Sequence, residues 1–471
     1  MNIILICLTL LFVFLILLNY LKSNKKPVII TISRLFVGVV FAFSGFVKAV
    51  DPMGSTIKYT DYFHSFGLEF LIAYVFPLAI ILSTIEFIVG VSLIFNIKIK
   101  ISSLITLLFM VFFTPLTFYL AIANPVTDCG CFGDALVITN WQTFWKNIVI
   151  LMPALIVFFN RTEIKAWLSK TNELIVILVG SVAVIWFSIY CDQHLPVLDF
   201  RPYKIGNNIS ALQKEIYELD ENIPEEKAIL DRVPQNERQD SVITTFIYEK
   251  NGVRKEFIDV PEDTTWQWKE TKNKVIREGY HPPIHDFSIT DLLGNDITKT
   301  VLSDSSYNFL IISYKIKKAD FNGIIAATKL AASTNYKFYF LTASLNEDIA
   351  MLEDSLTKLI NNKAIDYQPK PTETKVTETI YYYEKDGETM EFTADEIPED
   401  NTWEYIGEEE VESIKTTTNK NLPFSFFTTD EITLKTIIRS NPGLVLIKNG
   451  TIIKKWAYTD IPKSVENIIF E

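Results

Sequence analysis

Long hydrophobic runs dominate the first 191 residues of the chain. They cover residues 3–21, 28–50, 70–95, 101–123, 142–159 and 173–190. A helix needs about 20 apolar residues to cross a bilayer, so the pattern predicts six membrane-spanning helices. The first run has no basic segment before it and no cleavage site of small residues after it. We therefore expect it to remain as a helix rather than to be removed as a signal peptide.

Basic residues gather in alternate loops between these runs. They follow the first, third and fifth runs and are Lys22, Lys25, Lys26, Lys98, Lys100, Arg161, Lys165 and Lys170. Because short loops rich in Lys and Arg stay in the cytoplasm, these three loops are predicted to be cytoplasmic. The amino terminus, the loop Asp128–Asn140 and everything after Tyr190 are then expected outside. This topology predicts a six-pass protein of the bacterial inner membrane with a periplasmic carboxyl-terminal part.

The pattern changes after residue 191. Residues 192–240 are polar, and they predict a linker with one helix near 209–221. Beyond residue 280, short apolar runs alternate with amphipathic segments, which is typical of an α/β domain. Strands are predicted at 307–314 and 337–341, helices at 320–333, 346–361 and near 429–440, and a last strand and hairpin at 442–450.

A short sequence occurs twice in this second half. Tyr-Glu-Lys-Asn-Gly at 248–252 returns as Tyr-Glu-Lys-Asp-Gly at 383–387, and each copy continues to Glu-Phe, Pro-Glu-Asp and Trp. Asn-Gly and Asp-Gly between strand-like residues are strong hairpin signals. We therefore predict a β-hairpin module at 241–279 and a second one inserted at about 365–420.

Charge divides the chain in the same way as hydropathy. Residues 1–191 carry a formal charge of +4, and the remaining residues carry −16. An acidic outer part argues against binding to nucleic acid or to anionic lipid head groups. It suits a soluble domain that is held near the membrane.

Candidate chemistry centres on Cys129 and Cys131, which lie in the predicted outer loop and are two of only four cysteines. Two cysteines with one residue between them either exchange electrons or form a static disulfide, and an outer, oxidising face permits both. Asp128 and Asp134 would raise the thiol pKa, and no basic residue is near in sequence. Cys191 is a possible redox partner.

Two ionisable residues fall inside predicted spans. Glu86 lies within the third run, and Lys48 ends the second run. An intramembrane carboxylate indicates either a functional site or a hydrogen bond to a neighbouring helix, and a lysine at a helix end often extends to the interface. If Lys48 reaches back toward Glu86, the pair offsets part of the cost of burying each charge.

These residues carry a family resemblance. Ser44-Gly45, Lys48, Asp51-Pro52, Glu86 with Gly90, and Asp128-Cys-Gly-Cys-Phe-Gly133 together resemble the DoxX/MauE superfamily, whose MauE branch is associated with methylamine utilisation. The resemblance implies a four-helix membrane unit at 28–160, with extra helices at 1–27 and 161–191. It also implies a thiol–disulfide or quinone-linked role at the outer face, with quinone as a possible cofactor.

A second resemblance lies in residues 280–471. Pro442 before the apolar strand and Lys-Asn-Gly hairpin, with Pro283, Phe287, Asp291 and Gly294 upstream, is similar to thioredoxin-like domains. Such domains carry Cys-x-x-Cys after the first core strand, but this chain has no cysteine after Cys191. The resemblance implies an inactive domain that binds an extended peptide at the edge containing Pro442.

The predicted fold is therefore an α-helical membrane bundle followed by a thioredoxin-like α/β domain with duplicated β-hairpin modules. No metal site is expected, because Pro282 and Pro283 disfavour a helical pair of His281 and His285. We expect a scaffold whose outer domain binds another envelope or membrane protein without catalysis. The alternative is a redox relay through Cys129 and Cys131; transport of a small molecule rests on Glu86 alone.

Overall fold

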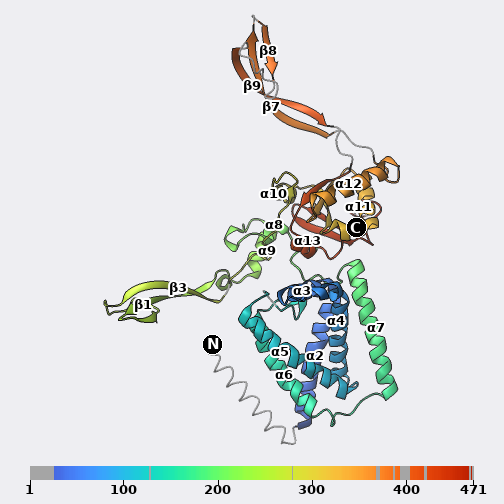
Figure 1. Ribbon diagram of the computed structural model, residues 1–471, viewed down its shortest axis with the longest axis vertical. Coiled ribbons are helices and arrows are strands. Elements are labelled where there is room, and N and C mark those ends of the chain that lie inside the picture. Colours follow the sequence, from blue (N-terminus) through green and yellow to red (C-terminus); the bar gives the residue numbers. More distant parts are fainter. Residues whose placement is uncertain are drawn as a thin grey trace.

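A computed structural model describes residues 26–126, 129–277, 279–367, 372–385, 388–392, 404–417, 422–465 and 468. It consists of an apolar helical bundle, an α/β domain above it and two projecting β modules (Figure 1). The first hydrophobic run, which includes Cys7, lies outside the described residues, and so does Asp128. So do the Asp-Gly turn of the second module and its Trp403.

Five described helices are long and apolar enough to cross a membrane. They are α2 (Lys26–Val50), the segment Glu69–Ile94 that contains α4 (Val75–Ile94), α5 (Ile99–Ala123), α6 (Asn140–Phe159) and α7 (Lys170–His194). They match the last five predicted runs to within a few residues. An additional amphipathic helix, α3 (Pro52–Ser65), follows α2. Asp51 caps α3 by accepting a hydrogen bond from the backbone amide of Gly54, and Pro52 occupies its first turn.

The α/β domain contains a six-stranded mixed sheet of order β12-β11-β5-β6-β10-β4. Its strands are β4 (Thr290–Asp291), β5 (Tyr307–Ser313), β6 (Lys337–Thr342), β10 (Ser425–Thr428), β11 (Gly443–Lys448) and β12 (Thr451–Ala457). The neighbouring inner strands β5 and β11 are buried on both faces. The Asn-Gly turn between β11 and β12 has positive φ at both residues, as a tight hairpin requires. The peptide bond before Pro442 is cis.

Helices cover both faces of this sheet. One core packs under α11 (Phe321–Ala332) and α12 (Asn346–Asn361), and the other packs under α10 (Thr298–Leu302) and α13 (Glu431–Ile437). The helices predicted at 320–333 and 346–361 are therefore confirmed. The helix expected near 429–440 is shorter, because the chain turns into β11 through an extended Ile438.

Part of the segment 192–240, expected from sequence to be a linker, packs on the α/β domain. Tyr203 and Ile209 are buried in the second core, and Asn208 bridges to Thr451 of β12. The single helix expected at 209–221 is replaced by the short α8 (Ile209–Leu212) and a 3-10 turn at Ile216–Glu218, followed by α9 (Pro224–Arg232). Most residues of the segment are polar, but the burial of a few apolar side chains is enough to favour its packing on the domain.

Both β modules have three strands rather than two. The first contains β1 (Ser241–Lys250), β2 (Val253–Phe257) and β3 (Gln267–Arg277), in the order β2-β1-β3. The second contains β7 (Thr372–Lys385), β8 (Glu388–Phe392) and β9 (Glu404–Thr417), in the equivalent order β8-β7-β9. The hairpin expected at Asn251-Gly252 is present, with positive φ at both residues. The third strand of each module, which pairs with the first, was not predicted from the sequence.

Candidate functional site: the Cys-Gly-Cys loop above an intramembrane ion pair

Close contact between α2 and α4 forms the floor of the site. A Cβ atom added to Gly45 would overlap the backbone of Phe87, and one added to Gly90 would overlap the backbone of Ala42. Small residues allow membrane helices to approach closely where lipid offers no hydrophobic driving force. The two glycines therefore determine how near the polar side chains of α2 and α4 come to each other.

That approach brings Lys48 and Glu86 together. The ammonium nitrogen of Lys48 lies 2.7 Å from Oε2 of Glu86, and the side chains are 9% and 13% exposed. Lys48 also donates to the hydroxyl of Ser44 at 3.2 Å. The hydroxyl of Ser44 donates to the backbone carbonyl of Cys131 at 2.8 Å. A continuous chain of polar contacts thus joins the ion pair in the bundle to the cysteine loop.

Glycines and a tyrosine shape the loop that carries the cysteines. Gly130 and Gly133 have φ of +62° and +51°, a region that costs other residues strain. The amide of Gly133 donates to the carbonyl of Gly130 at 3.0 Å, which closes a tight turn. The hydroxyl of Tyr62, on α3, donates to the carbonyl of Cys129 at 2.7 Å. The Cys-x-Cys-Phe-Gly pattern therefore encodes one loop conformation.

This conformation places the two sulfur atoms 2.8 Å apart as free thiols. The hydrogen bond from Cys129, together with the positive charges of Lys146 and Lys48, lowers the pKa of Cys131 to about 6. The same hydrogen bond, and then burial, raise the pKa of Cys129. One sulfur is thus a thiolate at neutral pH and the other is a thiol, the division of roles that thiol–disulfide exchange requires.

The structure corrects the electrostatic expectation for the loop. Asp134 faces away from the sulfurs toward Arg439, and the cations missing from the neighbouring sequence come from other helices. Lys146, in α6, lies with its nitrogen 4.4 Å from the ring centre of Phe132. The sequence does show Lys146 as a charged residue in the first turns of an apolar run. Only the packing of α6 shows that this lysine lies near the cysteines.

A cavity of about 70 Å³ joins these groups. Ser44, Lys48 and Glu86 line it together with Tyr59, both cysteines and Lys146. Burial raises the pKa of Tyr59 to about 12, so its hydroxyl keeps its proton at neutral pH. Small-molecule pockets commonly hold about 300–1,000 Å³, whereas this space suits a few water-sized molecules. Its contents would therefore be protons and water rather than a large ligand.

The other residues singled out by sequence lie apart from this cavity. Cys191 is fully buried near the end of α7, and the described residues include no sulfur atom in contact with it. Pro442 lies in the α/β domain, against Gly323 of α11. His281 lies 3.5 Å from Asp240, and the part of the chain described here holds no cluster of metal-ligating side chains.

Comparison with known proteins supports the same division of the chain. Residues 26–160 match the model of a family described as methylamine utilisation protein MauE. The membrane unit is thus MauE-like, and the chain is a membrane protein. One model, described as a domain of unknown function (DUF8463), matches both 242–278 and 377–412, which cover the two β modules. No curated protein and no solved structure matches the chain. The likeness to thioredoxins remains a prediction.

Proposed function

We propose that the MauE-like unit exchanges thiols and disulfides with a protein of the bacterial envelope through Cys129 and Cys131. The observation that carries the proposal is the sulfur pair at 2.8 Å, in which Lys146 and Lys48 favour the thiolate of Cys131. A structural thiol pair needs no such cations, whereas a nucleophilic one does. The redox role, the weaker expectation from sequence, is therefore the better supported one.

The reaction balances as two thiol–disulfide exchanges. The thiolate of Cys131 attacks a disulfide of the partner protein, forms a mixed disulfide and releases one partner thiolate. Cys129 then gives up its proton and attacks the sulfur of Cys131, which releases the second partner thiolate. The partner gains two electrons, and the cysteine pair becomes a disulfide.

A quinol of the bilayer, which carries two electrons and two protons, is the proposed reductant that restores the dithiol. Lys48 and Glu86 line the same cavity as the two cysteines, and we propose that the protons exchanged with the cysteine pair pass along them.

We propose that the site faces the periplasm. The loops that the positive-inside rule assigns to the cytoplasm gather at the opposite end of the bundle. There Lys26 pairs with Glu163 at 2.5 Å, and Lys98 pairs with Glu173 at 3.3 Å. The cysteine loop lies at the end of the bundle that carries α3 and the α/β domain (Figure 1).

Trapping of the mixed disulfide tests the proposal. With Cys129→Ser, the partner stays bound to Cys131, so non-reducing gels of native membranes should show a covalent adduct that reductant removes. Cys131→Ser, the matched control, should show none. Mass spectrometry of the unaltered chain should find a mixture of thiol and disulfide that shifts when quinone is depleted. A pair that is fully oxidised in both conditions is a static disulfide and contradicts the proposal.

The β modules favour a second, non-catalytic role for the outer part. The first module exposes Ile258, Val260 and Trp268 at 70%, 72% and 58%. Ile258 and Val260 lie in the loop after β2, and Trp268 lies on β3. Exposed apolar side chains on a part that projects from a domain are typical of a protein-binding surface. We propose that these modules bind the envelope partner. Replacement of residues 242–276 by a short Gly-Ser turn should abolish the adduct of the Cys129→Ser chain while leaving Cys131 reactive to small alkylating reagents.

A further inference from the structure

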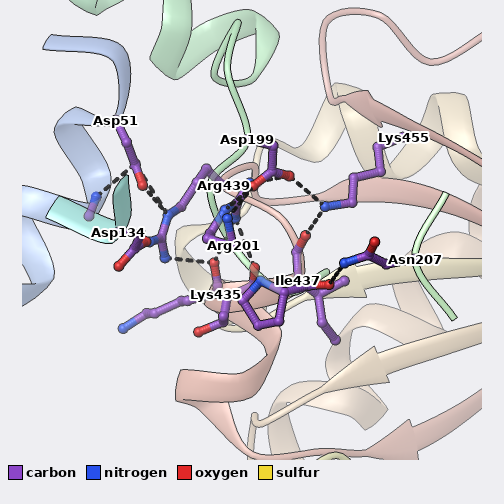
Figure 2. A network of polar contacts seen from close by, with 12 residues as sticks. Asp51, Asp134, Asp199, Arg201, Asn207, Lys435, Ile437, Arg439 and Lys455 are labelled. Atoms are coloured by element: carbon purple, nitrogen blue, oxygen red, sulfur yellow. Dashed lines mark hydrogen bonds and ion pairs between the residues drawn. The ribbon is translucent and has the colours of Figure 1, made fainter. Parts of the chain in front are cut away.

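A buried arginine of the α/β domain contacts the membrane unit, in addition to contacts that Thr459 and Asp460 make with the end of α7. Arg439 follows α13 and is 6% exposed. Its Nε lies 3.0 Å from a carboxylate oxygen of Asp51, and its Nη2 lies 2.9 Å from Asp134. Figure 2 shows the guanidinium between these two carboxylates, both of which belong to the MauE-like unit. A planar guanidinium directs its N–H groups at two acids in a fixed geometry, whereas a lysine offers a flexible point charge.

Both carboxylates belong to elements that hold the cysteines. Asp51 caps α3, the helix whose Tyr62 bonds the carbonyl of Cys129. Asp134 lies three residues after Cys131, in the 3-10 turn Gly133–Ala135. Arg439 therefore acts on the cysteine loop from both sides, through α3 and through the turn that ends the loop.

Arg439 is itself held by a network inside the α/β domain. The last carbonyls of α13, at Lys435, Thr436 and Ile437, accept hydrogen bonds from Arg439, Arg201 and Lys455 respectively. Asp199 bonds Arg201 at 2.8 Å and Lys455 at 2.9 Å (Figure 2). Cations at the carbonyl end of a helix are favourable. Three buried cations face three carboxylates, so the charges balance only when the α/β domain and the membrane unit are in contact.

We propose that the α/β domain binds the membrane unit of its own chain, and that Arg439 is a positioning residue that fixes the Cys-Gly-Cys loop. The proposal rests on the proposed thiol–disulfide function. Removal of one partner from a buried ionic network leaves an uncompensated charge, so the contact forms as a whole or separates as a whole. Arg439 lies three residues before Pro442, so the α/β domain contacts the membrane unit close to the edge expected from sequence to bind a foreign peptide. We expect an envelope partner to bind on the β modules instead.

The test compares Arg439→Gln with the unaltered full-length chain in detergent. Peptide mass spectrometry measures the rate at which iodoacetamide alkylates Cys131 between pH 5 and pH 10, and hydrogen exchange measures protection of α3. We expect loss of Arg439 to increase exchange in α3 and to move the midpoint of alkylation upward from about pH 6 toward an ordinary thiol value of about 8.5. Alkylation at pH 7 should fall at least tenfold, whereas the rate at pH 10, which reports access alone, should not fall.

Asp134→Asn provides a milder variant if Arg439→Gln does not fold, because it keeps the shape of the side chain and leaves the contact with Asp51. It should shift the midpoint in the same direction by a smaller amount. Lys358→Gln, which alters an exposed ion pair with Asp354 on α12, is the control and should change neither readout.

The outcomes separate the two proposals. An unaltered chain with a midpoint near 8.5 would overturn the proposed function whatever the variants do, while increased exchange in α3 of Arg439→Gln would still support binding of the α/β domain. A low midpoint in the unaltered chain that Arg439→Gln leaves unchanged overturns the positioning role. Unchanged exchange in α3 overturns the contact itself.

Discussion

Two ionic clusters hold the cysteine loop from opposite sides, and they differ in origin. Below the loop, Lys48 and Glu86 form a single pair that is supplied wholly by the membrane unit. Above it, Arg439 joins Asp51 and Asp134 across two parts of the chain. The lower pair bears on the sulfurs through charge, since Lys48 lowers the pKa of Cys131, whereas the upper cluster bears on them through position. The comparison teaches that the reactivity of Cys131 depends both on the charges near its sulfur and on the contacts that fix the loop in place.

The largest effect is expected where the lower pair loses its geometry. Gly90→Leu would force α2 and α4 apart, because even a Cβ at this position overlaps the backbone of Ala42. Overpacking of a tight crossing typically costs about 1–3 kcal/mol and more where the backbone must move, as it must here, so we expect no folded protein in detergent. Size-exclusion chromatography would detect the loss. Gly67→Ala, at a turn with open space but positive φ, should remain folded and serves as control.

A smaller loss should follow when one charge of the lower pair is removed. Glu86→Leu leaves Lys48 buried without its carboxylate, which costs about 3–5 kcal/mol. The double variant Lys48→Met, Glu86→Leu removes both charges and should regain most of that stability. Thermal unfolding of the purified chain would measure both. Equal melting temperatures for the single and double variants would show that the two side chains do not depend on each other.

Reactivity should respond to Lys146 without a large loss of stability. Lys146→Gln removes positive charge near the sulfurs, so the pKa of Cys131 should rise above about 6. The thiolate fraction, and with it the alkylation rate, would then fall between pH 5.5 and 7 and would be unchanged above pH 9. Lys100→Gln, at the opposite end of the bundle, provides the comparison. If the pH profile matches that of the unaltered chain, Lys48 and Cys129 alone lower the pKa of Cys131, and Lys146 does not contribute.

The smallest effect is expected far from both clusters. Lys358 and Asp354 form an exposed pair on α12, with side chains 68% and 62% accessible. Such pairs contribute about 0.3–0.5 kcal/mol, so Lys358→Ala should leave the melting temperature nearly unchanged and alkylation of Cys131 unaffected. A large effect on either would mean that the α/β domain communicates with the loop by a route other than Arg439.

Local pattern was enough to predict most elements but not the contacts between them. Hydropathy located the five described spans, and the Asn-Gly turn of the first β module followed from turn chemistry. The closeness of Lys48 and Glu86 was conceivable from sequence because both are charged residues in apolar runs. Lys146, Tyr62 and Arg439 could not be assigned, since each reaches the site from a separate element. Their roles depend on tertiary packing, which the spacing of hydrophobic residues along the chain does not predict.

The length and direction of the second β module affect how a protein bound to it could reach the cysteine loop. Strands β7 and β9 contain 14 residues each, so at roughly 3.3 Å per residue the pair extends about 45 Å. Figure 1 shows the module pointing away from the helical bundle, so a protein bound at its far end would lie on the opposite side of the α/β domain from the cysteine loop. A linkage raises local concentration only where both sites can be reached at once. A partner that binds there would therefore need to be long enough to extend past the α/β domain to the loop.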